Sequence, residues 1–211
     1  MNQGDKDYFK NRENHGFSHL NAYNPNIIIP RVKIIMKETK IRPGYFVLDF
    51  GCAKGFYLKG FEEEGVSVIG YDISEYAITV ANEFLKREVA FANFEKIETL
   101  ASKKRFDLVL MKDTAEHIAE PILSIMFRRL AKIAKKVLVI VPVIEKNGKT
   151  CPDRYRDPTH INMQSDYYWR EYLGNYGSVQ ELPTLTQKLK KEYSNICCSF
   201  IINFKIFGET N

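Results

Sequence analysis

Apolar residues along this chain follow two alternating patterns, nearly continuous runs and helical repeats. The runs lie at 47–50, 66–69, 88–91, 106–111 and 136–142, and they are typical of parallel strands covered on both faces. After Ser74 and after Pro121, apolar residues recur every three or four positions, which predicts two helices packed on a sheet. The recurring residues are Ala77, Val80, Ala81, Phe84 and Leu85 in the first helix, and Ile122, Ile125, Met126, Leu130 and Ile133 in the second.

The two ends of the chain differ from this central part. A helix is expected near Pro30 to Lys40, and two further strands at 179–182 and 198–207, joined by a Lys-rich loop. Residues 1–30 are polar and aromatic. The chain is therefore divided into an N-terminal arm, residues 1–30, and one domain, residues 31–211.

Composition agrees with one globular domain, because 45% of the 211 residues are hydrophobic and 27% are charged. No apolar run reaches about 18 residues and the N-terminus is polar, so a soluble, cytoplasmic protein without a membrane partner is expected. The four cysteines lack metal-type spacing and are expected to be reduced thiols. A net charge of +5 would suit an anionic partner. Since the basic residues are spread along the chain, solvated surfaces are the commoner explanation, and no nucleic-acid partner is expected.

The most informative segment is a glycine turn followed by a second strand that ends in an acid. Asp49-x-Gly51-x-Ala53-x-Gly55 follows the first apolar run, and Asp72 ends the next. This order is typical of a nucleoside-binding βαβ unit. A dinucleotide fingerprint would need further glycines, and an acid before the turn would repel a pyrophosphate but attract a cationic ligand. Taken singly, the turn is a weak signal, and Asp72 could simply cap the helix near Ser74.

Together these residues resemble the first two motifs of the class I S-adenosylmethionine-dependent methyltransferases, with Ala53 in place of the middle glycine. Segments 91–95, 105–118 with its Asp113-x-x-Glu116-His117 ending, and 135–142 follow in the family's order. The resemblance covers roughly residues 45 to 145 well. It implies an α/β, Rossmann-like, seven-stranded, mostly parallel sheet with helices on both faces and the last strand antiparallel. A nucleotide-binding oxidoreductase or a degenerate, inactive fold remains the alternative.

The same resemblance implies S-adenosyl-L-methionine as cofactor and S-adenosyl-L-homocysteine as product. Asp72 would chelate the ribose diol, Asn93 would reach the adenine amino group and Phe94 would cover the ring. Cys52 is expected to be a small residue beside the ligand, and a reactive role is the alternative. The implied cofactor-binding residues are Asp49, Gly51, Cys52, Ala53, Gly55, Asp72, Ile73, Asn93, Phe94, Lys112 and Asp113.

His160 is the expected catalytic residue. Methyl transfer is an in-line displacement at carbon, so an enzyme that methylates a hydroxyl must align it and remove its proton. An imidazole, with an ordinary pKa near ~6.5, suits that step. Thr159-His160 resembles a pair found in ubiquinone-pathway O-methyltransferases, although Asn162 stands where an aromatic commonly follows. Alternatively, His160 caps the helix at 165–173 or bonds within its loop, and His117 is the rival base.

The acceptor site is expected to include the segment after the fifth strand. Arg154, Tyr155 and Arg156 suggest an anionic or sugar-bearing acceptor, because guanidinium groups bind phosphate or carboxylate. Surface salt bridges are the alternative. In similar enzymes an arm such as residues 1–30 closes over the pocket as a lid; a disordered or packed tail is the alternative here. The expected substrate-binding residues are His15, His19, His117, Arg154, Tyr155 and Arg156.

The function implied is O-methylation of a small molecule or a sugar or glycan precursor, possibly anionic. Methylation of a protein or RNA, and binding of S-adenosylmethionine without turnover, are the alternatives. A magnesium site made of Asp113, Glu116, His117 and His160 is not expected, because histidine is a poor magnesium ligand. No metal is therefore predicted. The identity of the acceptor and the oligomeric state stay open.

Overall fold

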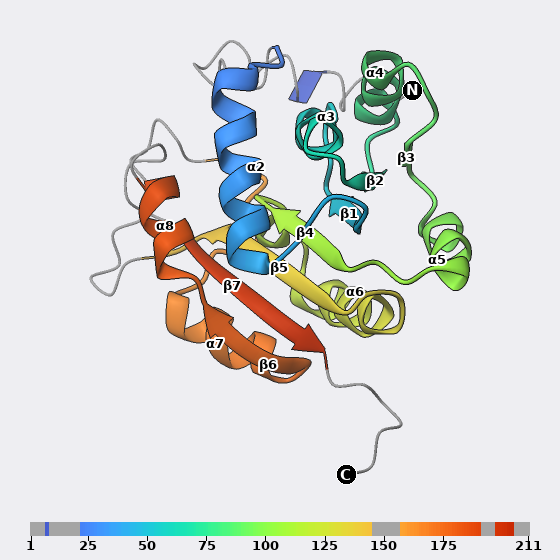
Figure 1. Cartoon of the computed structure of the whole chain (residues 1–211). Coiled ribbons are helices and arrows are strands. Elements are labelled where there is room, and N and C mark those ends of the chain that lie inside the picture. Colours follow the sequence, from blue (N-terminus) through green and yellow to red (C-terminus); the bar gives the residue numbers. More distant parts are fainter. Residues whose placement is uncertain (1–6, 9–21, 145–156, 191–196, 205–211) are drawn as a thin grey trace. The chain divides into compact units, whose positions relative to one another are not determined.

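The computed structural model describes residues 7–8, 22–144, 157–190 and 197–204, which belong to two units, residues 1–106 and 107–211 (Figure 1). We call them the N-terminal and the C-terminal unit. The elements of the N-terminal unit are α2 (Pro25–Thr39), β1 (Phe46–Phe50), α3 (Phe56–Glu63), β2 (Ser67–Tyr71), α4 (Glu75–Leu85), β3 (Ala90–Phe91) and α5 (Phe94–Lys103). Those of the C-terminal unit are β4 (Leu108–Lys112), the 3₁₀ helix η2 (Ala115–His117), α6 (Glu120–Ile133), β5 (Lys136–Pro142), α7 (Asp166–Gly174), β6 (Gly177–Glu181), α8 (Pro183–Lys190) and β7 (Cys197–Phe204).

The strands of the N-terminal unit are parallel and lie in the order β3-β2-β1. In the register of β1 and β2, Asp49 is opposite Gly70. Val47, Leu48 and Val68 are buried in these strands, as expected of parallel strands covered by helices. Because both strands run the same way, the turn after β1 and the acid after β2 reach the same edge of the sheet.

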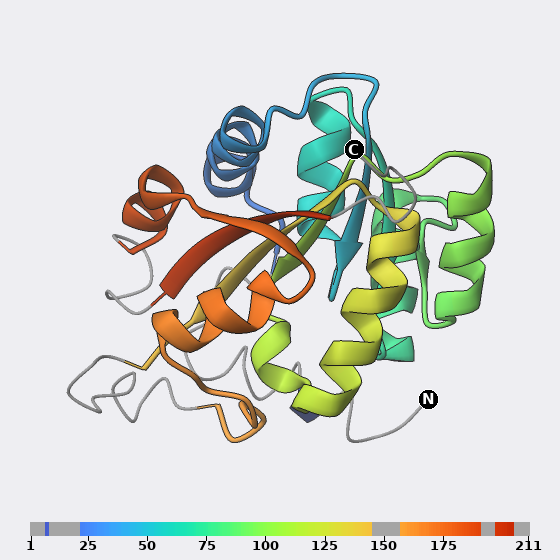
Figure 2. The same cartoon turned by 90° about the horizontal axis from the view of Figure 1, so that it is seen from below.

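The C-terminal unit contains the antiparallel strand that the sequence predicts. Its strand order is β4-β5-β7-β6, in which β4 and β5 are parallel while β7 runs antiparallel to both β5 and β6. Figure 2 shows α8 on one face of β7 and α7 on the other. The seven strands, mostly parallel and with β7 reversed, confirm the predicted Rossmann-like α/β fold class.

Helix α2 begins at Pro25, five residues before the predicted start at Pro30. The Asn24 side chain caps it by accepting a 3.0 Å bond from the Asn26 amide, and proline is suited to a first helical turn because it has no N–H to leave unpaired. Pro30 lies inside the helix. Since α2 packs on α3, with Ile28 so close to Gly60 that a Cβ there would lie 2.6 Å from Ile28 Cγ2, residues 25–30 belong to the packed unit. Helix α2 thus spans the position of the expected boundary, and the division into an arm and a domain stays a prediction.

The predicted inner face of α6 is partly wrong. Ile122 and Ile125 are 56% and 58% exposed, whereas Leu123 and Phe127 are fully buried, and Met126, Leu130 and Ile133 are buried as expected. Apolar residues occur on both sides of this helix, so spacing alone does not identify the side that faces the strands.

The prediction of a simple Lys-rich loop between the last two strands is wrong. Helix α8 begins there at Pro183, where proline is again suited to the first turn, and its Leu185 is fully buried. The last strand starts at Cys197, one residue before the predicted start, and is described as far as Phe204.

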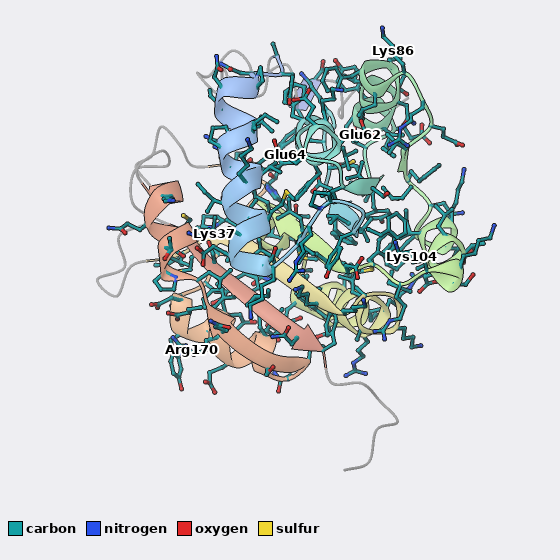
Figure 3. The ribbon with its side chains drawn as sticks, in the orientation of Figure 1. Lys37, Glu62, Glu64, Lys86, Lys104 and Arg170 are labelled. Carbon is teal, nitrogen blue, oxygen red and sulfur yellow. The ribbon has the colours of Figure 1, made fainter. Side chains whose placement is uncertain are left out.

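Charged side chains lie on the solvent-facing sides of these elements (Figure 3). Lys86 and Lys104 follow the ends of α4 and α5, and Arg170 of α7 pairs with Glu181 of β6. Lys103 and Lys104, which belong to one of the two dense basic clusters in the sequence, are exposed to solvent. Among the described residues, every helix is too short or too polar to cross a membrane.

Candidate functional site

The turn after β1 is fastened to the end of β2 by three backbone amides. Gly51 N and Cys52 N both donate to Tyr71 O, at 2.7 and 3.0 Å, and Ala53 N donates to Asp72 Oδ2 at 2.8 Å. Gly51 and Ala53 have φ of 87° and 44°, in the left-handed region that glycine adopts most readily. The turn therefore has a fixed shape, and one of its three left-handed residues, Gly51, Ala53 and Gly55, is an alanine.

Asp72 holds the turn and the start of α4 together. Its second oxygen, Oδ1, accepts a 2.9 Å bond from Ser74 N, while the Ser74 hydroxyl caps α4 by accepting from Ala77 N. Ser74, not Asp72, is thus the helix cap. Two N–H bonds do not exhaust the roughly four acceptor positions of a carboxylate, so the chemistry of Asp72 is compatible with the predicted contact to a ribose diol.

Cys52 lies in the turn among buried groups. Burial, and next the charges of Asp49 and Asp72, raise the pKa of the Cys52 thiol well above its ordinary value. The thiol is therefore protonated at neutral pH, as expected of a small packing residue. Gly70 lies directly against it, because a Cβ on Gly70 would meet Cys52 Sγ at 2.7 Å and Leu58 Cδ1 at 2.9 Å.

Of the two residues predicted to contact adenine, Asn93 caps a helix and Phe94 is buried among aromatic rings. The Asn93 side chain caps α5 by accepting a 2.8 Å bond from Glu95 N. The buried ring of Phe94 packs edge-on against Phe50 and Tyr71, with centroids 6.0 and 5.3 Å apart. Ile73, by contrast, is 86% exposed beside Asp72. An apolar side chain that is so open to solvent beside a possible ribose ligand is suited to cover a bound ring.

In the C-terminal unit, Lys112 and Asp113 lie where β4 ends. Lys112 Nζ donates to the Asp113 carboxylate, and Asp113 N donates to Ile140 O of β5 at 2.9 Å. Asp113 has φ of 50°, a conformation that aspartate tolerates better than most residues. The two side chains predicted to bind the cofactor here thus form an ion pair with each other.

The predicted catalytic histidines lie side by side within this unit. The rings of His117 and His160 are 4.7 Å apart between centroids and meet edge to face. His160 Nε2 lies 4.0 Å from Glu116 Oε1 and 3.9 Å from Asp157 Oδ2. Ser165 caps the helix that follows, which removes the alternative role of His160 as that cap.

A threonine joins His117 to an aspartate. Thr159 Oγ1 lies 2.6 Å from Asp157 Oδ1 and 2.8 Å from His117 Nδ1. The buried Asn162 ties the same segment to η2, because its backbone N donates to Glu116 O at 2.9 Å and its Nδ2 donates to Ile118 O at 3.2 Å. The sequence alone assigns no separate role to Asp157, Thr159 or Asn162. The Asp-x-Thr spacing, typical of an Asx turn, was the available signal.

A metal ion has one candidate set of ligands among the described residues. Glu116, His117 and His160 each offer an atom, and these atoms all lie within 4.8 Å of one another. One carboxylate and two imidazoles suit a transition metal better than magnesium. The expectation that no metal is bound stays a prediction.

Several predicted acceptor-site residues lie outside the described residues. They are His15, His19, Arg154, Tyr155 and Arg156. From the last part of the arm, Tyr23 is described. Its hydroxyl donates to Glu63 at 2.8 Å and its ring packs against Phe56 and Phe84.

Comparison with known proteins gives one family and several relatives. Residues 30–179 match the family described as "Methyltransferase domain". The ubiquinone biosynthesis O-methyltransferase of Nitrosospira multiformis is 30% identical over 112 residues, which cover 51% of this chain and 46% of that protein. The O-antigen chain terminator bifunctional methyltransferase/kinase WbdD of Escherichia coli is 25% identical over 135 residues, 58% of this chain and 19% of that protein. The chain thus spans half or less of the length of these two relatives.

The fold is also found among solved structures. A SAM-dependent methyltransferase from Archaeoglobus fulgidus aligns with 93% of this chain and 99% of its own, with a TM-score of 0.66 and 17% identity. This likeness shows that the two proteins share a fold.

Proposed function

Because the chain belongs to the methyltransferase domain family, we propose that it transfers the methyl group of S-adenosylmethionine to a hydroxyl oxygen of a small molecule or a sugar-bearing precursor. S-adenosylhomocysteine is then the second product. The observation that carries the proposal is the turn after β1, which the Asp72 carboxylate and the Tyr71 carbonyl hold in a fixed shape.

The electrostatics of this turn support a cationic donor. Asp49 is buried, and both Asp49 and Asp72 are close enough to Cys52 to disfavour its thiolate. The same negative potential favours the sulfonium and ammonium groups of S-adenosylmethionine and disfavours a pyrophosphate. In this proposal Asp72 binds the ribose hydroxyls, and the exposed Ile73 covers the adenine.

The C-terminal unit supports an oxygen acceptor. A sulfonium leaves without help from an acid, so the remaining task is to position a hydroxyl and accept its proton. Two neighbouring imidazoles, His117 and His160, are the groups suited to this at neutral pH.

The relatives and the sequence support the proposed acceptor class. The two relatives named above are, by their names, enzymes of ubiquinone and O-antigen biosynthesis. We extend their acceptor types, a small hydroxyl compound or a glycan, to this chain as a proposal. Arg154, Tyr155 and Arg156 would contact an anionic or sugar group of this acceptor.

Calorimetric titration tests the donor site first. Micromolar binding of both S-adenosylmethionine and S-adenosylhomocysteine is the expected result, and NAD serves as the negative control. Binding of NAD alone would contradict the assignment of the turn.

A screen with radiolabelled methyl donor then compares phenols, sugar phosphates and a short RNA. Transfer to the RNA alone would contradict a small-molecule acceptor, and donor binding without any transfer would indicate a binding protein.

A further inference from the structure

The Asn82 side chain of α4 makes three hydrogen bonds to the backbone where β3 begins. Its Oδ1 accepts from Val89 N and from Ala90 N, both at 2.8 Å, and its Nδ2 donates to Ala90 O at 3.1 Å. A side-chain amide has an oxygen with two lone pairs and a nitrogen with two hydrogens, so Asn82 uses most of its bonding capacity on these two residues. Because β3 is at one end of the strand order, the half-buried Asn82 takes the place of a further strand beside it.

The backbone of Asn82 holds the other end of the same connection. Its carbonyl oxygen accepts from Arg87 N at 3.2 Å and from Lys86 N, and these bonds close the end of α4. The link between α4 and β3 consists of residues 86–89. One residue therefore fixes both the start of this link and its end.

Among the strands described in the N-terminal unit, β3 is the shortest. It consists of Ala90 and Phe91, which pair with Gly70 and Tyr71 of β2. Lys96 of α5 also lies over β3, with its Nζ 4.0 Å from the Phe91 ring centroid. The Lys96 side chain is 45% exposed, however, and such a contact is weak in water. Since short strands at a sheet edge open easily, three bonds from one side chain contribute strongly to the position of β3.

Strand β3 connects the two ends of the proposed donor site. Phe91 O accepts from Asp72 N at 3.3 Å, and Asp72 is the residue proposed to bind the ribose. Asn93, predicted to reach the adenine amino group, follows β3 after one residue. Helix α4 begins just beyond Asp72, whose Oδ1 accepts from Ser74 N. Asp72, α4, Asn82 and β3 thus form a closed ring of contacts, which sets the distance between the ribose end and the adenine end.

We propose that Asn82 is a positioning residue for the adenine end of the donor site, because it holds β3 where Asn93 meets the adenine while Asp72 binds the ribose. The inference rests on the proposed donor site. Asn82 acts through the backbone of β3 rather than on the ligand. When β3 moves, the contacts to the base are lost first, and a small misplacement of a bound group is costly to binding and to alignment.

Substitution of Asn82 tests the inference through base selectivity. Asn82→Leu keeps the approximate size of the side chain and removes all three bonds, whereas Asn82→Asp keeps the two acceptor bonds and loses the donor to Ala90 O. Thr79→Val is the matched control, because Thr79 is exposed on the same helix and its hydroxyl donates within α4, to Glu75 O at 2.9 Å. Calorimetry measures the Kd of S-adenosylhomocysteine and of S-inosylhomocysteine, in which a carbonyl oxygen replaces the adenine amino group.

The ratio of the two Kd values separates positioning from general stability. The wild type and Thr79→Val should prefer S-adenosylhomocysteine by about tenfold or more, as expected of a site that reads a polar group. Asn82→Leu should bind S-adenosylhomocysteine about tenfold more weakly than the wild type and lose most of this preference, and Asn82→Asp should lie between them. A general loss of stability would weaken both ligands by the same factor and leave the ratio unchanged.

Hydrogen exchange gives a measurement that needs no ligand. The amides of Val89 and Ala90 donate to the Asn82 carbonyl oxygen of the side chain in the wild type, so they should exchange slowly. They should exchange faster in Asn82→Leu, and remain slow in Asn82→Asp and in Thr79→Val.

Two results would overturn the inference. One is a folded Asn82→Leu variant that keeps the wild-type Kd ratio, and the other is a wild type that binds the two ligands equally. If only Asn82→Asp folds, its Kd ratio decides in the same way. Failure of the proposed function looks different, because the wild type would then bind neither ligand, and the inference would fall with it, or would bind the donor without transferring its methyl group.

Discussion

The Ala53 amide donates a 2.8 Å hydrogen bond to the Asp72 carboxylate, which lies 19 residues further along the chain. This bond joins the turn after β1 to the end of β2. The residue expected to hold a ribose is therefore also one that shapes the glycine turn, and its substitution should affect two properties that can be measured separately.

Asp72→Ala should weaken both cofactor binding and folding. It removes an acceptor from Ala53 N and from Ser74 N, and a lost bond to a charged group costs about 1.5–3 kcal/mol. We expect a lower free energy of unfolding in urea and at least about tenfold weaker binding of S-adenosylmethionine by calorimetry. Asp72→Asn, which keeps one acceptor oxygen, should be the more stable of the two variants. Unchanged affinity in Asp72→Ala would remove the ribose assignment.

Substitutions of Ala53 measure how much its left-handed conformation lowers the free energy of unfolding. With φ of 44°, alanine is strained by roughly 1–2 kcal/mol relative to an ordinary conformation, and glycine is not. Glycine loses more entropy on folding, so Ala53→Gly should raise the free energy of unfolding by up to about 1 kcal/mol. Ala53→Val should lower it, because a β-branched residue is poorly suited to positive φ. Equal stability of the Gly and Val variants would contradict this conformation.

Cys52 should resist alkylation. The reactive form of cysteine is the thiolate, and burial together with Asp49 and Asp72 raises the pKa of the Cys52 thiol. The thiol therefore remains protonated at pH 8 in the folded protein. Peptide mass spectrometry after iodoacetamide treatment should find Cys52 unmodified in buffer and modified in urea. The half-buried Cys198 is the internal comparison, and faster labelling of Cys52 than of Cys198 would contradict the assigned environment.

Neighbouring residues of α6 should differ sharply in their effect on stability. Leu123 is fully buried and Ile122 is 56% exposed. Leu123→Ala should cost about 2–5 kcal/mol through lost burial and the cavity it leaves, whereas Ile122→Ala should change the free energy of unfolding by about 0.5 kcal/mol or less. Thermal and urea unfolding of the two variants measure the difference. A larger loss for Ile122→Ala would reverse the face assigned to α6.

The fold class and the glycine turn could be predicted because their signals are local. Continuous apolar runs mark covered strands, and the Asp49 to Gly55 segment combines an acid with residues that accept positive φ. The inner face of α6 could not be predicted in the same way, since Ile122, Ile125 and Leu123 are equally apolar. Only packing against the strands distinguishes them.

The contact of the Thr159 hydroxyl with both His117 and Asp157 could not be predicted from the sequence either. Thr159 and His117 are separated by 42 residues, and the contact depends on the way in which Asn162 ties its segment to η2. A threonine beside a histidine carries no sign of a partner so distant in sequence. The sequence therefore indicated that His160 and His117 are important, but not that the Thr159 hydroxyl contacts the His117 ring.

The contact between Gly70 and Cys52 limits the order in which the two positions can change during evolution. A side chain at residue 70 would collide with Cys52 Sγ, so a lineage that first acquired alanine there would pass through a poorly folded intermediate. A lineage that first replaced Cys52 with glycine would remove that collision but not the one with Leu58 Cδ1, which a Cβ at residue 70 would meet at 2.9 Å. Descendants should therefore show a larger residue at position 70 only together with smaller residues at both 52 and 58.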